Sequence, residues 1–295
     1  MSLKIIFFVK YWFPVIVFLL GIIGNILGCI VIWSPKLANI GPQLTYKFLF
    51  ISDTVYLMQI IGTYLQYGFD IQLTYVSDLM CKLGIYFNFL MAVVSPLLLC
   101  YISIDRYISI KYPAKRFAFR KTNTQIIFFL IVFIYNSVFY LPIYFLVKLN
   151  NVTNITTNKT DLKCEIHPET GEIIFLMDIV NRVIIPFGLM LFSSILLIRE
   201  LFRSRTRIVE NFLAEENKTF YSEIRLATTC ICLNLIFILF NLPISIIDLF
   251  PSLFTINLYL YFYYLFYLSY AINFIILFIT NSLFQNGFFN IFKII

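Results

Sequence analysis

Long apolar runs separated by short polar segments dominate the pattern along this chain. A run of about 18 or more apolar residues can cross a hydrocarbon core of about 30 Å as an α-helix. Charges, Pro, Gly and Asn bound these runs. We predict an all-α, seven-transmembrane helix bundle followed by a short amphipathic helix on the membrane surface. The spans cover residues 12–33, 44–67, 79–110, 123–147, 173–201, 222–249 and 257–280, and the surface helix covers residues 282–293.

Composition favours a single membrane domain. Apolar residues make up 61% and charged residues 13% of the 295 residues. Soluble domains average about 45 to 50% apolar residues and about 25% charged residues. The spans and their short loops use nearly the whole length, so we predict one domain over residues 1–295. The third span is the longest and holds Asn88, Ser95 and Ser103. These polar residues predict a central helix that its neighbours shield from lipid.

The distribution of charge predicts the orientation in the membrane. Most of the 22 Lys and Arg residues flank the span ends that face the cytoplasm if the N-terminus is extracellular, as the positive-inside rule requires. Three glycosylation sequons, at Asn151, Asn154 and Asn158, fall in a loop that this orientation places outside. We therefore expect a multi-pass plasma-membrane glycoprotein with a cytoplasmic C-terminus. Because the basic residues lie next to the ends of the spans, at the membrane surface, a nucleic-acid partner is not expected.

Two of the six cysteines are in outer positions on the same predicted side: Cys81 at the start of the third span and Cys164 in the second outer loop. We expect a disulfide between them, which would tie the start of the third span to the second outer loop. The other four cysteines lie within spans, and the simplest interpretation is that they are small apolar core residues.

Several short motifs occur in order along the spans. They are Gly24-Asn25, Leu49 to Asp53, Asp105-Arg106-Tyr107 with Pro113, Pro186, Phe240 to Pro243, Asn273, and Phe284 with Phe288. In this order, each in its expected span, they resemble those of the rhodopsin-like G-protein-coupled receptors over almost the whole chain. The resemblance implies a receptor that binds an extracellular ligand and activates a heterotrimeric G protein by outward movement of the sixth helix.

The chain departs from this family's pattern at three places. Asn241 stands where the family usually has Trp, the motif that starts at Asn273 ends at Leu277 instead of Tyr, and the fourth span lacks its usual Trp. Pro186, Pro243 and Asn273 remain as expected switch and kink positions, because Pro inside a helix removes one backbone hydrogen bond. A receptor that serves as a scaffold without coupling to a G protein stays open as an alternative.

Arg106 keeps its charge at any physiological pH and needs carboxylate partners at the membrane edge. The resemblance implies an inactive-state lock and G-protein site at Asp105, Arg106 and Tyr107, closed by Glu223 at the start of the sixth span. In the alternative, Glu223 is an ordinary solvated residue.

Asp53 is a carboxylate in the middle of a span, where a charge is costly without partners or a task. The resemblance implies a sodium site at Asp53, Ser95, Ser269 and Asn273, with Asn25 close by, and oxygen ligands of this kind suit a hard cation. The alternative is a protonated Asp53 within a network of hydrogen bonds. Apart from this ion, no cofactor is expected.

The ligand is expected at the outer ends of the helices. Asn88 and Tyr267 occupy the family positions of the amine-binding Asp and the retinal-binding Lys, which argues against a monoamine receptor and a light receptor. Asp178 and Arg182 lie one helical turn apart and can simply pair with each other. An Arg inside the outer end of a helix, next to acids and aromatics, suits a ligand with amide and charged groups. The long second outer loop with its sequons resembles those of neuropeptide receptors, so we expect a small peptide. The candidate ligand-binding residues are Asn88, Asp178, Arg182, Asp248, Tyr263 and Tyr267.

Other classes of function find less support in the sequence. The single His, His167, excludes a histidine metal cluster, and no Gly-rich phosphate loop or catalytic triad is visible, so an enzyme is not expected. Channels and transporters typically contain an inverted repeat or a row of charges within the spans, and the sequence shows neither. A chemosensory or other small-molecule receptor remains an alternative to the peptide receptor.

Overall fold

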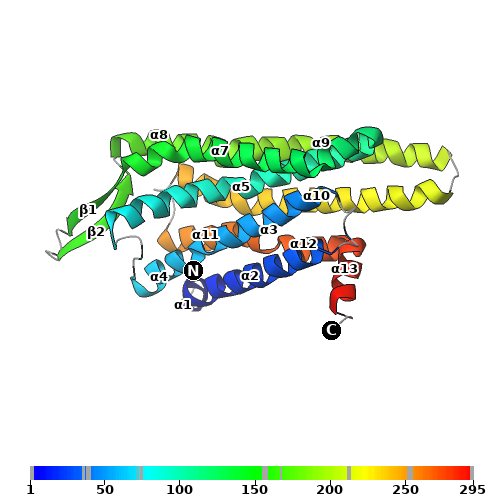
Figure 1. Cartoon of the computed structure of the whole chain (residues 1–295). Coiled ribbons are helices and arrows are strands. Elements are labelled where there is room, and N and C mark those ends of the chain that lie inside the picture. The colour runs from blue at the N-terminus through cyan, green and yellow to red at the C-terminus, as the bar shows by residue number, and fades with distance from the viewer. Residues whose placement is uncertain are drawn as a thin grey trace.

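The computed structural model describes residues 3–34, 37, 41–71, 73, 76–154, 159–166, 168–210, 214–250 and 255–292. Within these ranges the chain forms an elongated bundle of helices with one β-hairpin at one end (Figure 1). Six helices are long and apolar enough to cross a membrane, and a bent helix pair makes a seventh. The seven-helix, all-α prediction is confirmed.

The first three spans pack side by side. The first combines α1 (Leu3–Phe7), the π-helical turn η1 (Phe8–Trp12) and α2 (Phe13–Ile32), the second α3 (Gln43–Leu57) and α4 (Gln59–Phe69), and the third is α5 (Asp78–Lys111). The predicted start of the first span at residue 12 was too late. Lys4 and Lys10 lie near the end of that helix, where long basic side chains can extend toward water without ending it.

The remaining spans follow after a short connection, η4 (Pro113–Lys115) and α6 (Arg116–Arg120). The fourth span is α7 (Thr122–Leu146), and the fifth joins α8 (Pro168–Asp178), the π-helical segment η5 (Ile179–Ile184) and α9 (Ile185–Glu210). The sixth is α10 (Ala214–Leu249), and the seventh is α11 (Ile256–Ala271) with α12 (Asn273–Thr280), bent by 49°. The fifth and sixth helices extend beyond the predicted ends because their polar flanks remain helical.

The β-hairpin was not predicted from the sequence. It pairs β1 (Val147–Asn154) with β2 (Lys159–Ile166) in an antiparallel register that sets Leu149 opposite Cys164. A polar segment rich in Asn and Thr lacks the apolar alternation by which strands are recognised. The predicted disulfide between Cys81 and Cys164 is present and fixes β2 to the start of α5.

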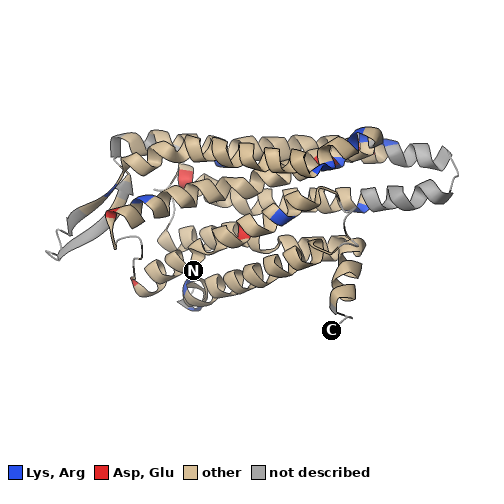
Figure 2. Cartoon of the chain, in the orientation of Figure 1, with Lys and Arg blue, Asp and Glu red and all other residues tan. Residues whose placement is uncertain are grey.

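The helix α5 forms the axis of the bundle, as predicted for the third span. It packs against α3, α7, α9 and α10, and of the six long spans it is the most buried. Ser95 and Ser103 are buried within it. Figure 2 shows few charged residues along the middle of the bundle, in keeping with a core that the helices supply to one another.

The short helix α13 (Ser282–Phe292) follows the last span and turns away from the bundle axis (Figure 1). Phe284 is fully buried and packs its ring against Phe274 of α12, whereas Phe289 is half exposed. The predicted amphipathic helix is therefore present, but part of its apolar face binds the bundle rather than the membrane surface.

Close contact between the first two spans depends on glycine. A methyl group at Gly28 would collide with the ring of Phe50 on α3, whereas one at the exposed Gly188 on α9 would meet open space. We predict that Gly28→Ala lowers stability by about 1 to 3 kcal/mol, because overpacking displaces neighbouring side chains. Gly188→Ala is the matched control and gains up to about 1 kcal/mol of helix propensity. Thermal unfolding of the two purified variants checks this, and equal midpoints would contradict it.

Candidate functional site

Polar side chains gather at three depths of the bundle. We call the end that carries β1 and β2 the hairpin end, and the end that carries Arg106 the arginine end. Helix α5 connects them, since Cys81 is bonded to the hairpin and Arg106 lies roughly 37 Å further along the helix. The third location is the centre of the bundle, around Asp53.

At the hairpin end, Arg182 pairs with two carboxylates. Its Nε lies 2.9 Å from Asp178 Oδ2, and its Nη2 lies 3.1 Å from Asp248 Oδ2. The guanidinium also lies over the ring of Phe266, 5.5 Å from its centre. The predicted pairing of Asp178 with Arg182 is thus present, and Asp248 of α10 joins it. We call Asp178, Arg182 and Asp248 the charge triad.

The charge triad is held in place from the fourth span. Tyr140 donates a hydrogen bond of 2.9 Å to Asp178 Oδ1, and Asn181 Nδ2 donates to Tyr140 Oη at 3.1 Å and to Asn136 Oδ1 at 2.9 Å. Asn181 and Arg182 lie in η5, where a π-helical turn adds a residue and so changes the direction of the side chains. The sequence analysis missed Tyr140, Asn136 and Asn181, because their roles depend on this contact between spans.

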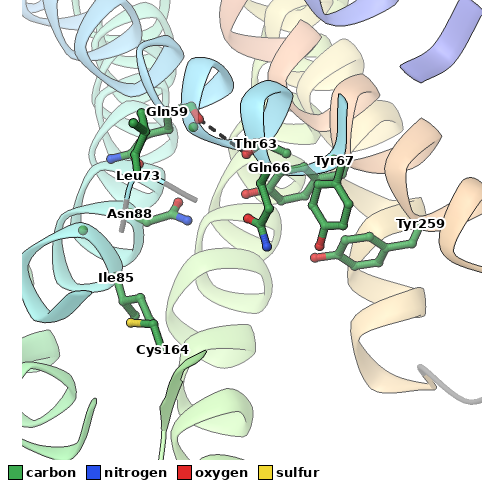
Figure 3. Close-up of a pocket in the computed structure, with 12 residues that line it drawn as sticks. Gln59, Thr63, Gln66, Tyr67, Leu73, Ile85, Asn88, Cys164 and Tyr259 are labelled. Carbon is green, nitrogen blue, oxygen red and sulfur yellow. Dashed lines mark hydrogen bonds between the residues drawn. The ribbon is translucent and has the colours of Figure 1, made fainter. Parts of the chain in front are cut away.

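Two cavities open beside the charge triad. The larger, of about 240 Å³, lies between α4, α5 and α11; in Figure 3, Gln66 and Tyr67 extend from α4 toward Tyr259 of α11, and Asn88 of α5 lies opposite. The smaller, of about 110 Å³, has the charge triad in its wall. Asn88, Tyr259 and Tyr263 line both. Of the predicted ligand-binding residues, Tyr267 alone lines neither cavity.

Tyrosines connect the cavities with the centre of the bundle. Tyr263 and Tyr267 share a hydrogen bond of 3.2 Å between their hydroxyl groups. Tyr56 stacks on Tyr267 and packs against Tyr270, whose hydroxyl donates to the carbonyl of Ala92 on α5 at 2.8 Å. This group joins α3, α5 and α11 through ring contacts and buried hydroxyls. The side chains of the cavity wall are therefore in direct contact with those of the core.

At the centre, Asp53 is fully buried and accepts a hydrogen bond of 2.7 Å from Asn273 Nδ2 to its Oδ2. Its Oδ1, Ser95 Oγ and Asn25 Oδ1 are buried without a hydrogen-bonding partner in the described chain. Ser95 lies beside Asp53, but the geometry does not make a hydrogen bond. Unpartnered oxygens of this kind fit a hard cation.

Asn241 makes a connection between helices at the place where the resemblance led us to expect Trp. Its Nδ2 donates to Ser269 Oγ of α11 at 3.2 Å and to the carbonyl of Phe237 at 2.7 Å. Ser269 also donates to the carbonyl of Phe266. A polar link between α10 and α11 thus occupies the position of an aromatic one, and its Ser269 lies one helical turn before Asn273, the partner of Asp53.

At the arginine end, Asp105 binds two arginines. Arg106 Nη2 lies 2.5 Å from Asp105 Oδ2, and both side chains are fully buried. Arg120 of α6 places its Nε 3.4 Å from Asp105 Oδ1 and donates from Nη2 to Ser109 Oγ at 2.7 Å. Tyr107 accepts a hydrogen bond from Lys111 at the exposed edge. The expected partner Asp105 is therefore in place, and Arg120 is a second cation that the sequence analysis did not identify.

Gly41, in the connection between the first two spans, also contacts Arg106. Its φ of +107° is a conformation that residues with a side chain rarely adopt, and a Cβ there would overlap the Arg106 guanidinium. Glycine at this position therefore allows the backbone to approach the charged group.

The comparison with known protein families agrees with this geometry. The model of the 7 transmembrane receptor (rhodopsin family) matches residues 24–277. The chain belongs to this receptor family. No curated protein sequence matches the chain. Members of the family are receptors and not enzymes, and their partners are in general G proteins and extracellular ligands.

Some predicted residues of this receptor cannot be located. Asn158 lies outside the described residues, and the backbone of Asn151 and Asn154 belongs to β1 although their side chains are not described. The side chain of Glu223 also lies outside the described residues, so the lock between Glu223 and Arg106 stays a prediction. Pro186 is buried in α9, and Pro243 lies inside α10.

Two further polar groups at the arginine end were missed by the sequence analysis. Asn234 of α10 donates to Ser103 Oγ of α5 at 2.8 Å and to Ser194 Oγ of α9 at 3.0 Å. Gln125 of α7 accepts from Thr45 N at 2.9 Å and Thr45 Oγ1 at 3.0 Å, and donates to the carbonyl of Arg120 at 2.8 Å. Asn234 is a single amide within an apolar run, and Gln125 follows the polar residues that begin α7, so only their contacts distinguish them.

We predict that Gln125→Ala destabilises the receptor by about 1 to 3 kcal/mol, because the buried N–H of Thr45 loses its acceptor. Asn123→Ala is the control at an exposed position of the same helix turn and should change stability by less than about 0.5 kcal/mol. Thermal midpoints in the same detergent provide the measurement. A Gln125→Ala midpoint within error of the Asn123→Ala midpoint would show that these bonds contribute nothing.

Proposed function

We propose that this receptor binds an extracellular peptide at its hairpin end and activates a heterotrimeric G protein at its arginine end. The observation that carries the proposal is the position of two polar sites along the single helix α5. The charge triad and its cavities lie beside the hairpin-proximal half of α5, and the buried pair of Asp105 and Arg106 lies at its other end. One continuous helix can therefore connect a binding site with a coupling site.

The proposed orientation places the hairpin end outside the cell and the C-terminus in the cytoplasm. The positive-inside rule supports it, because the basic residues concentrate at the arginine end of the spans. The disulfide between Cys81 and Cys164 lies at the hairpin end, and such bonds persist in oxidising surroundings. Both observations favour a plasma-membrane receptor with glycosylation at Asn151, Asn154 and Asn158.

The walls of the larger cavity favour a peptide. Gln59, Gln66 and Asn88 are amides that can each donate and accept hydrogen bonds, and Thr63 adds a hydroxyl. Peptide backbones offer the same complementary groups in regular alternation. A lipid ligand would favour a predominantly apolar wall, which this cavity does not have. A small polar molecule is the second candidate, since its groups could use the same amides.

Activation would move α10 away from α5. Pro243 interrupts the backbone hydrogen bonds of α10 and supplies a point of bending. The bonds from Asn234 to Ser103 and from Thr280 Oγ1 to Thr229 Oγ1, at 2.8 Å each, hold the same helix to α5 and α12. If these hydrogen bonds break when α10 moves, and the ion pairs of Arg106 with Asp105 and Glu223 break as well, Arg106 becomes available to the G protein.

We predict that Arg106→Ala abolishes nucleotide exchange on a panel of G proteins, because the residue that reaches the G protein is lost. We predict that Glu223→Ala raises basal exchange, because it removes a carboxylate from the proposed lock. Arg203→Ala, an exposed arginine on α9, is the matched control and should behave as wild type. Each variant is compared at equal surface expression. Silence of wild type and all variants would favour the non-coupling scaffold instead.

We also propose that Asp53 binds sodium. Asp53 Oδ1, Ser95 Oγ and Asn25 Oδ1 would supply oxygen ligands, and Asn273 would hold the other carboxylate oxygen in place. Ser269 completes the proposed set, although its hydroxyl already donates to Phe266 and accepts from Asn241. When bound, the ion supplies the positive charge that a buried carboxylate lacks.

We predict that sodium chloride raises the thermal midpoint of the purified wild type above that in choline chloride at equal ionic strength, since a ligand that binds the folded state stabilises it. Asp53→Asn should remove the difference. Asp70→Asn, at an exposed left-handed position that Asn tolerates, is the control and should keep it. Equal thermal midpoints of the wild type in sodium and choline chloride would contradict a sodium site and would favour a protonated Asp53 within a network of hydrogen bonds.

A further inference from the structure

By formal charge, the charge triad has one more negative than positive charge. Arg182 is a single cation that pairs with both Asp178 and Asp248. An unbalanced charge in a poorly hydrated site is unfavourable, because neither water nor a partner compensates it. The triad therefore favours the approach of a second cation over that of an anion.

The two carboxylates are not equivalent. Asp178 is fully buried; its Oδ1 accepts a hydrogen bond from Tyr140, and its Oδ2 forms an ion pair with Arg182 Nε at 2.9 Å without hydrogen-bond geometry. Asp248 engages Arg182 through Oδ2, and within the described chain its Oδ1 makes no hydrogen bond. Asp248 lines the smaller cavity. The surplus negative charge is thus available to a ligand at Asp248.

Arg182 offers little to an anion. Its Nε and Nη2 point at the two carboxylates, its face lies over Phe266, and only 12% of its side chain is exposed. The aromatic residues in the cavity wall, Tyr56, Phe89, Tyr259 and Tyr263, instead favour a cation, because the faces of aromatic rings carry partial negative charge.

We infer that the smaller cavity binds a cationic group of the ligand, a guanidinium or an amine, with Asp248 as its counter-charge. The neighbouring larger cavity, whose lining residues are all uncharged, binds the amide part of the same ligand. The inference rests on the proposed ligand-binding function of the hairpin end and narrows it to a peptide with a basic group. It also explains how a pocket with Asn88 in place of an acid can select a cation.

The charge balance can first be tested without a ligand. Asp248→Asn leaves one arginine facing one carboxylate, and Asn can still accept the hydrogen bond from Arg182. Arg182→Gln leaves two carboxylates without a cation. We expect the thermal midpoint of the purified receptor to stay equal or rise in Asp248→Asn and to fall in Arg182→Gln. A fall in both variants to the same extent would contradict a surplus charge at Asp248.

Binding is then measured with two probes of nearly the same shape, Nα-acetyl-arginine amide and its uncharged analogue Nα-acetyl-citrulline amide, in which a urea oxygen replaces one guanidinium nitrogen. Saturation-transfer NMR on the purified receptor in lipid nanodiscs reports the affinity of each. We expect the arginine probe to bind at least about tenfold more tightly to wild type, as a charge-assisted hydrogen bond provides. Asp248→Asn should remove the preference. The control Asp78→Asn, which alters the exposed partner of Lys82, should retain it.

Equal binding of the two probes to wild type, no binding of either, or tighter binding of Nα-acetyl-glutamate amide would overturn the inference. Retention of the preference in Asp248→Asn would overturn the assignment to this residue. The wild-type comparison needs no variant to fold. Neither measurement involves a G protein, so a receptor that fails to couple can still bind the arginine probe, and the two failures are distinguishable.

Discussion

Pairing of charged and polar groups within an apolar bundle is the constraint on which the rest of this structure depends. A charge that is surrounded by helices and lipid needs a partner on a neighbouring helix, because water cannot supply one. Arg182 obtains partners from its own span and from α10, and Asp53 obtains one from α12. These pairs fix how the helices are rotated, which the non-directional apolar contacts between them do not.

The same groups connect the hairpin end with the centre of the bundle. The tyrosines that line the cavities continue into Tyr267 and Tyr270, which contact α3 and α5, and Asn241 then links α10 to α11. Hydrogen bonds between hydroxyls and amides are short and directional, so a small displacement breaks them. A bundle held in this way can have discrete arrangements instead of deforming continuously.

The departures from the family pattern have a consistent physical reading. A Trp side chain would connect helices by packing. Asn241 instead connects α10 to α11 by its hydrogen bond to Ser269. At the arginine end, Arg120 and Gln125 attach α6 to α5, α7 and the start of α3. Polar side chains therefore connect neighbouring helices at both of these places.

The sequence by itself determined the helices, their approximate ends, the disulfide and the family, because apolar run length and ordered motifs are local properties of the chain. It also identified Arg106, Asp53 and Arg182, since charges within spans are conspicuous. Only the tertiary structure decided the partners of these charges, the hairpin, and the roles of Tyr140, Asn234 and Gln125. Those depend on which faces of distant helices meet, and that is set by packing across the whole bundle rather than by neighbours in the sequence.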